Sequence, residues 1–194
     1  MQFKRFLTTA QVKNTYGYID SQKKYEIIRT LVYFGISISL FIAGFIATKS
    51  KMNVLTVVAV LGCLPASKSL VSAIMFLRQK SCSKEVQDIV EPISIGLNGL
   101  YDLVFTTEKV TYKVAHAAYK AKCLVLFSED KLDENGLEAH IEEYMKRSGI
   151  KGVNVKVYTD LKKYAERLGQ MNALEAEEGK LAVEVVQLLK EITL

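Results

Sequence analysis

The sequence predicts an integral membrane α-helical hairpin of two transmembrane helices, followed by a small cytosolic α/β domain. Two long apolar runs, residues 31–48 and 54–77, lie in tandem with only a short polar connection between them. The rest of the chain is polar, and beyond residue 100 runs rich in β-branched and aromatic residues alternate with helical patterns. No motif with a specific chemistry accompanies these features, so the sequence predicts architecture more sharply than activity.

The first apolar run, residues 31–48, contains no charged residue. About 20 apolar residues span a hydrocarbon core of roughly 30 Å, and about 17 is the lower limit. The second run, residues 54–77, is longer but contains Pro65 and Lys68. A soluble core helix would explain either run alone, but two runs joined by residues 49–53 indicate a membrane hairpin.

The basic residues that flank the hairpin predict its orientation. Residues 1–30 contain six Lys and Arg, three more follow the second run as Arg78, Lys80 and Lys84, and the turn contains two. Because basic flanks remain on the cytoplasmic side, we expect a multi-pass protein of the cell membrane with both termini in the cytoplasm. Net charge is +4 over residues 1–30, +3 over 31–77 and −2 over 78–194. This distribution favours anionic lipid headgroups of the bilayer as the partner and predicts no nucleic-acid binding.

Small residues recur at helical spacing in both apolar runs and predict close helix packing. The packing we favour lies within the hairpin, while a homo-oligomer or a membrane-protein partner is the alternative. The predicted small-residue positions are Gly35, Ser39, Ala43 and Ala47 in the first run and Ala59, Gly62, Ala66, Ser69 and Ala73 in the second.

Pro65 and Lys68 are the two unusual residues of the second run. Pro65 removes one helical hydrogen bond and predicts a kink. A charge within a membrane is costly, so Lys68 is a candidate functional residue, in competition with snorkelling of its ammonium to the inner headgroups. Its helical position lies away from the small residues, which favours snorkelling.

We expect three parts in all: a cytosolic N-terminal segment (1–30), with a helix over 21–29 that continues into the membrane; the hairpin (31–77); and a cytosolic domain (82–194) that folds without the membrane. The domain has predicted strands at 101–107, 122–128 and 153–159, and predicted helices near 83–90, 133–148, 160–169 and from 173 onward.

Residues 109–121 fit two interpretations. As a strand they give a mixed sheet of three to four strands in α-β-β-β-α-β-α order, and as a helix they give a three-stranded parallel β-α-β-α-β sheet. The VTYKV run favours a strand, whereas the lack of Gly or Asn at 120–121 argues against a tight hairpin. We prefer the mixed sheet.

Polar residues follow each predicted strand, at the edge where open α/β sheets bind ligands. The same residue types are ordinary turn formers and helix caps, which is the interpretation we favour. No glycine-rich phosphate loop follows any strand. The positions are Thr106, Thr107, Glu108, Ser128, Glu129, Asp130, Thr159 and Asp160.

The α-β-β-β-α-β order is also compatible with a nuclease core of the restriction-endonuclease kind. That chemistry needs clustered carboxylates and a lysine to hold a metal and activate water. Asp102 and Glu108 could supply acids, and Glu129–Lys131 and Asp160–Lys162 match the (D/E)-x-K spacing. Both pairs fall just beyond a predicted strand, so we do not infer the activity.

Cysteine and histidine spacing gives no metal or disulfide framework. The chain has three cysteines, Cys63, Cys82 and Cys123, and none has CxxC spacing. Cys82 lies just after the second apolar run, where lipidation can occur. His140 and Glu143 could share one helix face, although a solvated surface explains them better. We therefore assign no catalytic, cofactor-binding or metal-ligating residue and expect no cofactor.

The function that the sequence favours is a membrane-anchored interaction or ligand-binding module, and not an enzyme. One alternative is a membrane-tethered enzyme with an unrecognised site. The other is a small oligomeric membrane component that uses Lys68.

Overall fold

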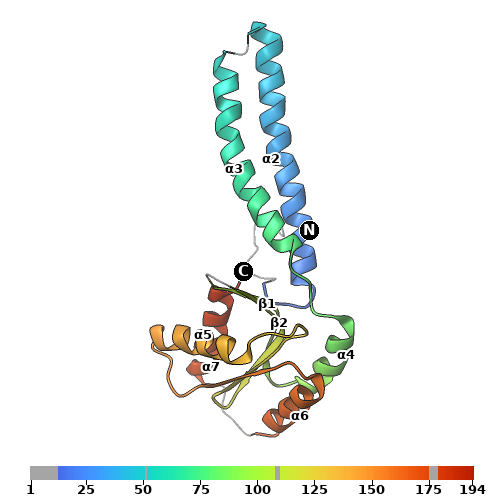
Figure 1. The fold of residues 1–194 in the computed structure, drawn as a ribbon, viewed down its shortest axis with the longest axis vertical. Coiled ribbons are helices and arrows are strands. Elements are labelled where there is room, and N and C mark those ends of the chain that lie inside the picture. Colours follow the sequence, from blue (N-terminus) through green and yellow to red (C-terminus); the bar gives the residue numbers. More distant parts are fainter. Residues whose placement is uncertain (1–12, 51, 108–109, 175–178) are drawn as a thin grey trace. The chain divides into compact units, whose positions relative to one another are not determined.

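The computed structural model describes residues 13–50, 52–107, 110–174 and 179–194. The chain divides into two compact units. Residues 19–80 form the helical unit, and residues 81–194 together with the described part of 1–18 form the α/β unit. Each unit is described separately below (Figure 1).

The helical unit consists of two long helices, α2 (Tyr18–Thr48) and α3 (Val54–Leu77). Both are long and apolar enough to cross a membrane. Asn53 organises the turn between them. Its side chain accepts a hydrogen bond from Thr56 N (2.8 Å) as the N-cap of α3, and donates one to Ser50 O (2.8 Å). Helix α2 begins well before residue 31, as the helical pattern of residues 21–29 predicted.

The predicted small-residue face of α3 is confirmed. Ala59, Ala66, Ser69 and Ala73 are buried. Gly62 lies on the same face, where a β-carbon would come within 2.7 Å of Ser37 Oγ on α2. Glycine at this position therefore lets the two helices approach closely.

The prediction that the small residues of α2 pack against α3 is wrong, and the alternative, that they pack against a second copy or a membrane-protein partner, stays a prediction. Gly35, Ser39, Ala43 and Ala47 are exposed, and the buried positions are Thr30, Ser37 and Gly44 instead. Steps of four residues rotate around a helix by about 40° each, whereas steps of seven drift by only about 20°. A straight partner helix therefore follows the seven-residue series and leaves the four-residue series.

A cluster of polar side chains joins the two helices near residues 26–30 of α2. Ser69 of α3 lies 2.8 Å from Thr30 Oγ1 and accepts a hydrogen bond from Arg29 Nε (3.1 Å). The Arg29 guanidinium also pairs with the buried Glu26 carboxylate at 2.6 Å. Hydrogen bonds of this kind fix the rotation of one apolar helix against another, because the apolar residues alone allow several registers.

The α/β unit contains a four-stranded mixed sheet in the order β1-β2-β3-β4. Strands β1 (Asn98–Thr106), β2 (Thr111–Lys120) and β3 (Cys123–Phe127) form an antiparallel meander, and β4 (Asn154–Tyr158) pairs parallel to β3. Residues 111–120 are therefore a strand, which confirms the mixed sheet and excludes the parallel alternative.

Helices cover both faces of this sheet (Figure 1). Helices α5 (Glu134–Arg147) and α7 (Lys180–Ile192) bury Leu137, Ile141 and Val185 against one face. Helices α4 (Lys84–Ile93) and α6 (Leu161–Asn172) bury Val90 and Tyr164 among others against the opposite face. Helix α6 continues past Gly169, where the sequence predicted its end.

The outer edge of β1 is covered by both ends of the described chain. Phe105 pairs with Thr193, and Tyr101 N donates to Asn14 O at 2.9 Å. Lys13 Nζ donates to the carbonyls of Lys190 (2.7 Å) and Thr193 (2.8 Å), at the C-terminal end of α7. A cation there satisfies free helix carbonyls and complements the helix dipole. Residues before the hairpin thus belong to the same unit as those after it.

A buried histidine organises the face of the sheet under α6. His116 of β2 is fully buried, and its Nδ1 lies 2.6 Å from the Tyr164 hydroxyl. Burial lowers the pKa of His116 to about 3 and raises the pKa of Tyr164 well above its usual value, so both groups are neutral at neutral pH. A β-carbon at Gly99 would lie 3.0 Å from His116 Nε2, so glycine in β1 makes room for the imidazole.

Candidate functional site

The polar residues that follow the strands have local structural roles. Ser128 Oγ closes a turn with Asp130, and Thr159 Oγ1 donates to Glu134 at 2.6 Å. Asp160 caps α6 by accepting from Lys162 N and Lys163 N. These are the cap and turn roles that the sequence favoured over a ligand site. Glu108 lies outside the described residues.

Two acids considered for nuclease chemistry accept hydrogen bonds from backbone amides instead. Asp102 accepts a hydrogen bond from Cys82 N (2.6 Å), and Glu129 accepts one from Ser83 N (2.7 Å). Glu129 and Lys131 lie in the loop after β3, not within a strand. The two carboxylates therefore fasten the segment by which the chain enters the α/β unit ahead of α4. Among the described residues, no group of three or more His, Cys, Asp or Glu side chains could hold a metal ion.

Cys82 lies in the segment that Asp102 and Glu129 hold. Its side chain is buried among residues of α4, α6 and the sheet. Burial, with the nearby Glu129 and Asp102 carboxylates, raises the pKa of its thiol to about 12. A buried neutral thiol is a poor acceptor for acylation, so the fold does not favour lipidation at Cys82.

The remaining candidates have local contacts or are exposed. Glu143 pairs with Arg147 at 2.6 Å on the surface of α5, while the His140 ring contacts Tyr144. Lys68 is exposed on α3, away from the buried face that carries Ser69, as its helical position predicted. Helix α3 is continuous through Pro65, and the kink at this residue stays a prediction.

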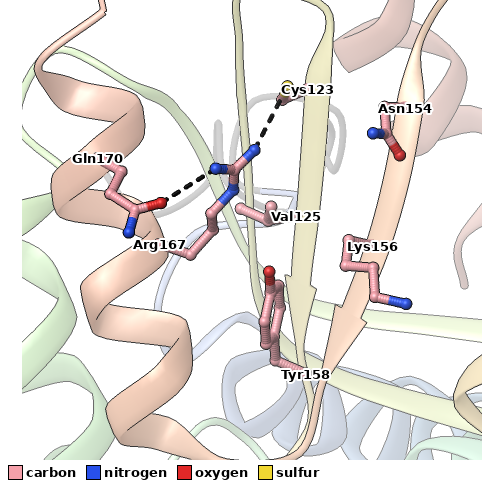
Figure 2. A pocket seen from close by; sticks show the side chains of 7 residues that line it. All are labelled: Cys123, Val125, Asn154, Lys156, Tyr158, Arg167 and Gln170. Atoms are coloured by element: carbon pink, nitrogen blue, oxygen red, sulfur yellow. Dashed lines mark hydrogen bonds between the residues drawn. The ribbon is translucent and has the colours of Figure 1, made fainter.

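A hollow with a volume of about 280 Å³ lies between α6 and the strands β3 and β4 (Figure 2). The period-two pattern of β4 explains its lining, because Val155 and Val157 are buried in the core of the opposite face. The intervening residues of β4 therefore face α6. The hollow is lined by Cys123, Val125, Asn154, Lys156, Tyr158, Arg167 and Gln170.

Arg167 is the central group of this hollow. Figure 2 shows its side chain reaching from α6 over Val125 toward β3. One guanidinium nitrogen donates to Gln170 Oε1 at 3.1 Å, and the other lies 3.8 Å from Cys123 Sγ. Neither partner is a carboxylate. Arg167 is absent from the ion pairs of the described residues, so its charge has no carboxylate partner there.

The lining is positively charged in an otherwise acidic part of the chain. It contains Arg167 and Lys156 and, among the described residues, no Asp or Glu. Lys156 turns its ammonium away from Arg167 (Figure 2) and pairs with Glu138 of α5 at 3.0 Å. That pair raises the pKa of Lys156. Glu138 also accepts a hydrogen bond from Val157 N at 2.9 Å, which covers part of the free edge of β4. Arg167 is therefore the cation left to meet a ligand.

The residues of this hollow were not predicted from the sequence. Arg167 stands on the polar side of an amphipathic helix, where arginine is usually solvated. The one available signal was the alternation in β4, which places Asn154, Lys156 and Tyr158 on one face. Only the packing of α6 against that face shows that the face is partly covered.

No protein family, curated protein or solved structure matches the chain.

Proposed function

We propose that this protein is a membrane-anchored α/β module that binds a ligand or partner next to the cytoplasmic face of the cell membrane. The exposed apolar surface of α2 and α3 supports the membrane anchoring. In the most apolar stretch of each long helix only 17% of the residues are buried. Large side chains such as Ile46 (70% exposed), Leu64 (69%) and Val57 (60%) lie on the outside. Soluble monomers rarely expose apolar surface on this scale, and lipid is the solvent that suits it.

The charge distribution supports a cytoplasmic position for both termini. The flanks of the hairpin carry nine Lys and Arg, six before it and three after it, against two in its turn. The α/β unit takes residues from both flanks, since Lys13 and Asn14 bond within it. A unit built from both flanks needs both of them on the same side of the bilayer.

The α/β unit supports a binding role better than nuclease chemistry. Among the described residues, the carboxylates considered for a metal accept hydrogen bonds from backbone amides or lie in loops, whereas Arg167 in the hollow under α6 has no acidic partner. We therefore propose that the described part of the unit holds a ligand and does not transform it.

Cysteine accessibility in intact cells tests the proposed orientation. We expect a membrane-impermeant maleimide to modify Ser50→Cys in the turn at once. Lys151→Cys, an exposed loop position of the α/β unit, should react only after the membrane is permeabilised. Peptide-resolved mass spectrometry separates these sites from the three native cysteines. Modification of Lys151→Cys in intact cells, with Ser50→Cys protected, would show the opposite orientation.

A further inference from the structure

We propose that the hollow between α6 and β4 binds a small organic phosphate, with Arg167 as the anchor for the phosphate group. The inference rests on the proposed binding role of the α/β unit, but not on its attachment to a membrane. Its failure would therefore leave the predicted labelling of Ser50→Cys and Lys151→Cys unchanged.

The hydrogen-bond partners of the Arg167 guanidinium favour binding of an anion. A guanidinium has five N–H donors in a planar fork that matches phosphate or carboxylate oxygens two at a time. Here the fork is held between an amide oxygen and a cysteine sulfur, and sulfur is a weak acceptor. The side chain is thus oriented in advance, and among the described residues its charge has no carboxylate partner, which reduces the ordering cost of binding an anion.

The other side chains of the hollow indicate an anion with several acceptor oxygens and an organic part. Asn154 and Gln170 carry amide donors, and Tyr158 carries a hydroxyl. A phosphate monoester presents three terminal oxygens to such a set, one more than a carboxylate. Val125 and the Tyr158 ring form a less polar wall for the rest of the ligand. The volume, about 280 Å³, admits a sugar phosphate but lies below the roughly 300 Å³ at which pockets for drug-sized ligands begin.

Isothermal titration of the full chain in detergent with ribose 5-phosphate tests the proposal. We expect saturable binding that ribose alone does not show, and weaker binding of inorganic phosphate and of acetate. Loss of a charge-assisted pair should weaken the binding of ribose 5-phosphate to Arg167→Gln by about tenfold to a hundredfold. Arg167→Lys keeps the charge without the planar guanidinium, so its affinity for ribose 5-phosphate should lie between those of the wild type and Arg167→Gln.

Arg147→Gln is the matched control. Arg147 lies on α5, is largely exposed and pairs with Glu143, so its loss removes the same charge without touching the hollow. Equal affinities for wild type and Arg167→Gln, equal losses in Arg147→Gln and Arg167→Gln, or tighter binding of acetate than of ribose 5-phosphate would each overturn the proposal. Competition by short-chain phosphatidic acid would identify a lipid headgroup as the phosphate source, and its absence a soluble metabolite; either agrees with the proposal.

A second measurement needs no variant. Cys123 is half-buried in the lining, so a bound phosphate should slow its alkylation by iodoacetamide in the wild-type chain. We expect ribose 5-phosphate to reduce the rate at Cys123 while leaving the rate at Cys63 unchanged. An unchanged rate at Cys123, at a concentration that saturates the titration, would place the ligand elsewhere and overturn the assignment.

Discussion

Tyr164→Ala is expected to lower the free energy of unfolding of the α/β unit by about 3–5 kcal/mol. Tyr164 is fully buried, its ring stacks on Phe127 with centroids 5.2 Å apart, and its hydroxyl meets His116. Truncation would leave a cavity between α6 and the sheet and remove the partner of a buried imidazole. Chemical denaturation followed by circular dichroism, on the full chain in detergent, measures the change.

Tyr164→Phe separates the two contributions. It keeps the ring and removes only the hydroxyl, leaving His116 Nδ1 unpaired at a cost of about 1–3 kcal/mol. If Tyr164→Phe and Tyr164→Ala destabilise the protein equally, the cavity contributes nothing. If Tyr164→Phe is as stable as the wild type, the buried hydrogen bond has no net value.

Asp102→Ala is expected to destabilise the α/β unit by about 2–4 kcal/mol, as the sum of two effects. The substitution leaves the buried amide of Cys82 without its 2.6 Å acceptor. It also places alanine at φ +56°, a left-handed conformation that aspartate and asparagine tolerate better than alanine does. Thermal unfolding in the same detergent would show the effect.

Asp102→Asn is the control for this position. It keeps an oxygen that can accept from Cys82 N and a residue type suited to positive φ, so we expect at most half the loss seen with alanine. Glu129→Gln, which keeps an acceptor for the exposed Ser83 N, should change stability little. Equal destabilisation by Asp102→Asn and Asp102→Ala would mean that the carboxylate charge, and not the backbone geometry, matters at this position.

The sheet was largely predictable because its strands are rich in β-branched and aromatic residues. The difficulty lay at one turn. The β2–β3 connection consists of Ala121 and Lys122, both with positive φ (51° and 61°). Turns of this shape normally use Asn or Gly, so their absence argued against a hairpin that is nevertheless present. Pairing of all five residues of β3 with residues 116–120 of β2 outweighs the local cost at two residues.

Features that depend on how elements pack could not be predicted in the same way. Small residues on α2 form a four-residue series and a seven-residue series, and only the partner helix selects the second. The role of Asp102 required knowing that residue 82 comes beside β1. The hollow around Arg167 combines residues from β3, β4 and α6. Its hydrogen-bonded residues Cys123 and Arg167 are 44 positions apart in the sequence.

Extraction of the full-length protein from cell membranes tests membrane anchoring most directly. Alkaline carbonate releases proteins held by charge or by other proteins, but it does not release helices whose apolar surface is in lipid. We expect the chain to remain in the membrane pellet after carbonate treatment and to enter the supernatant only with detergent. Release by carbonate, or recovery as a dispersed protein without detergent, would contradict the membrane hairpin and make α2 and α3 helices that another protein surface covers.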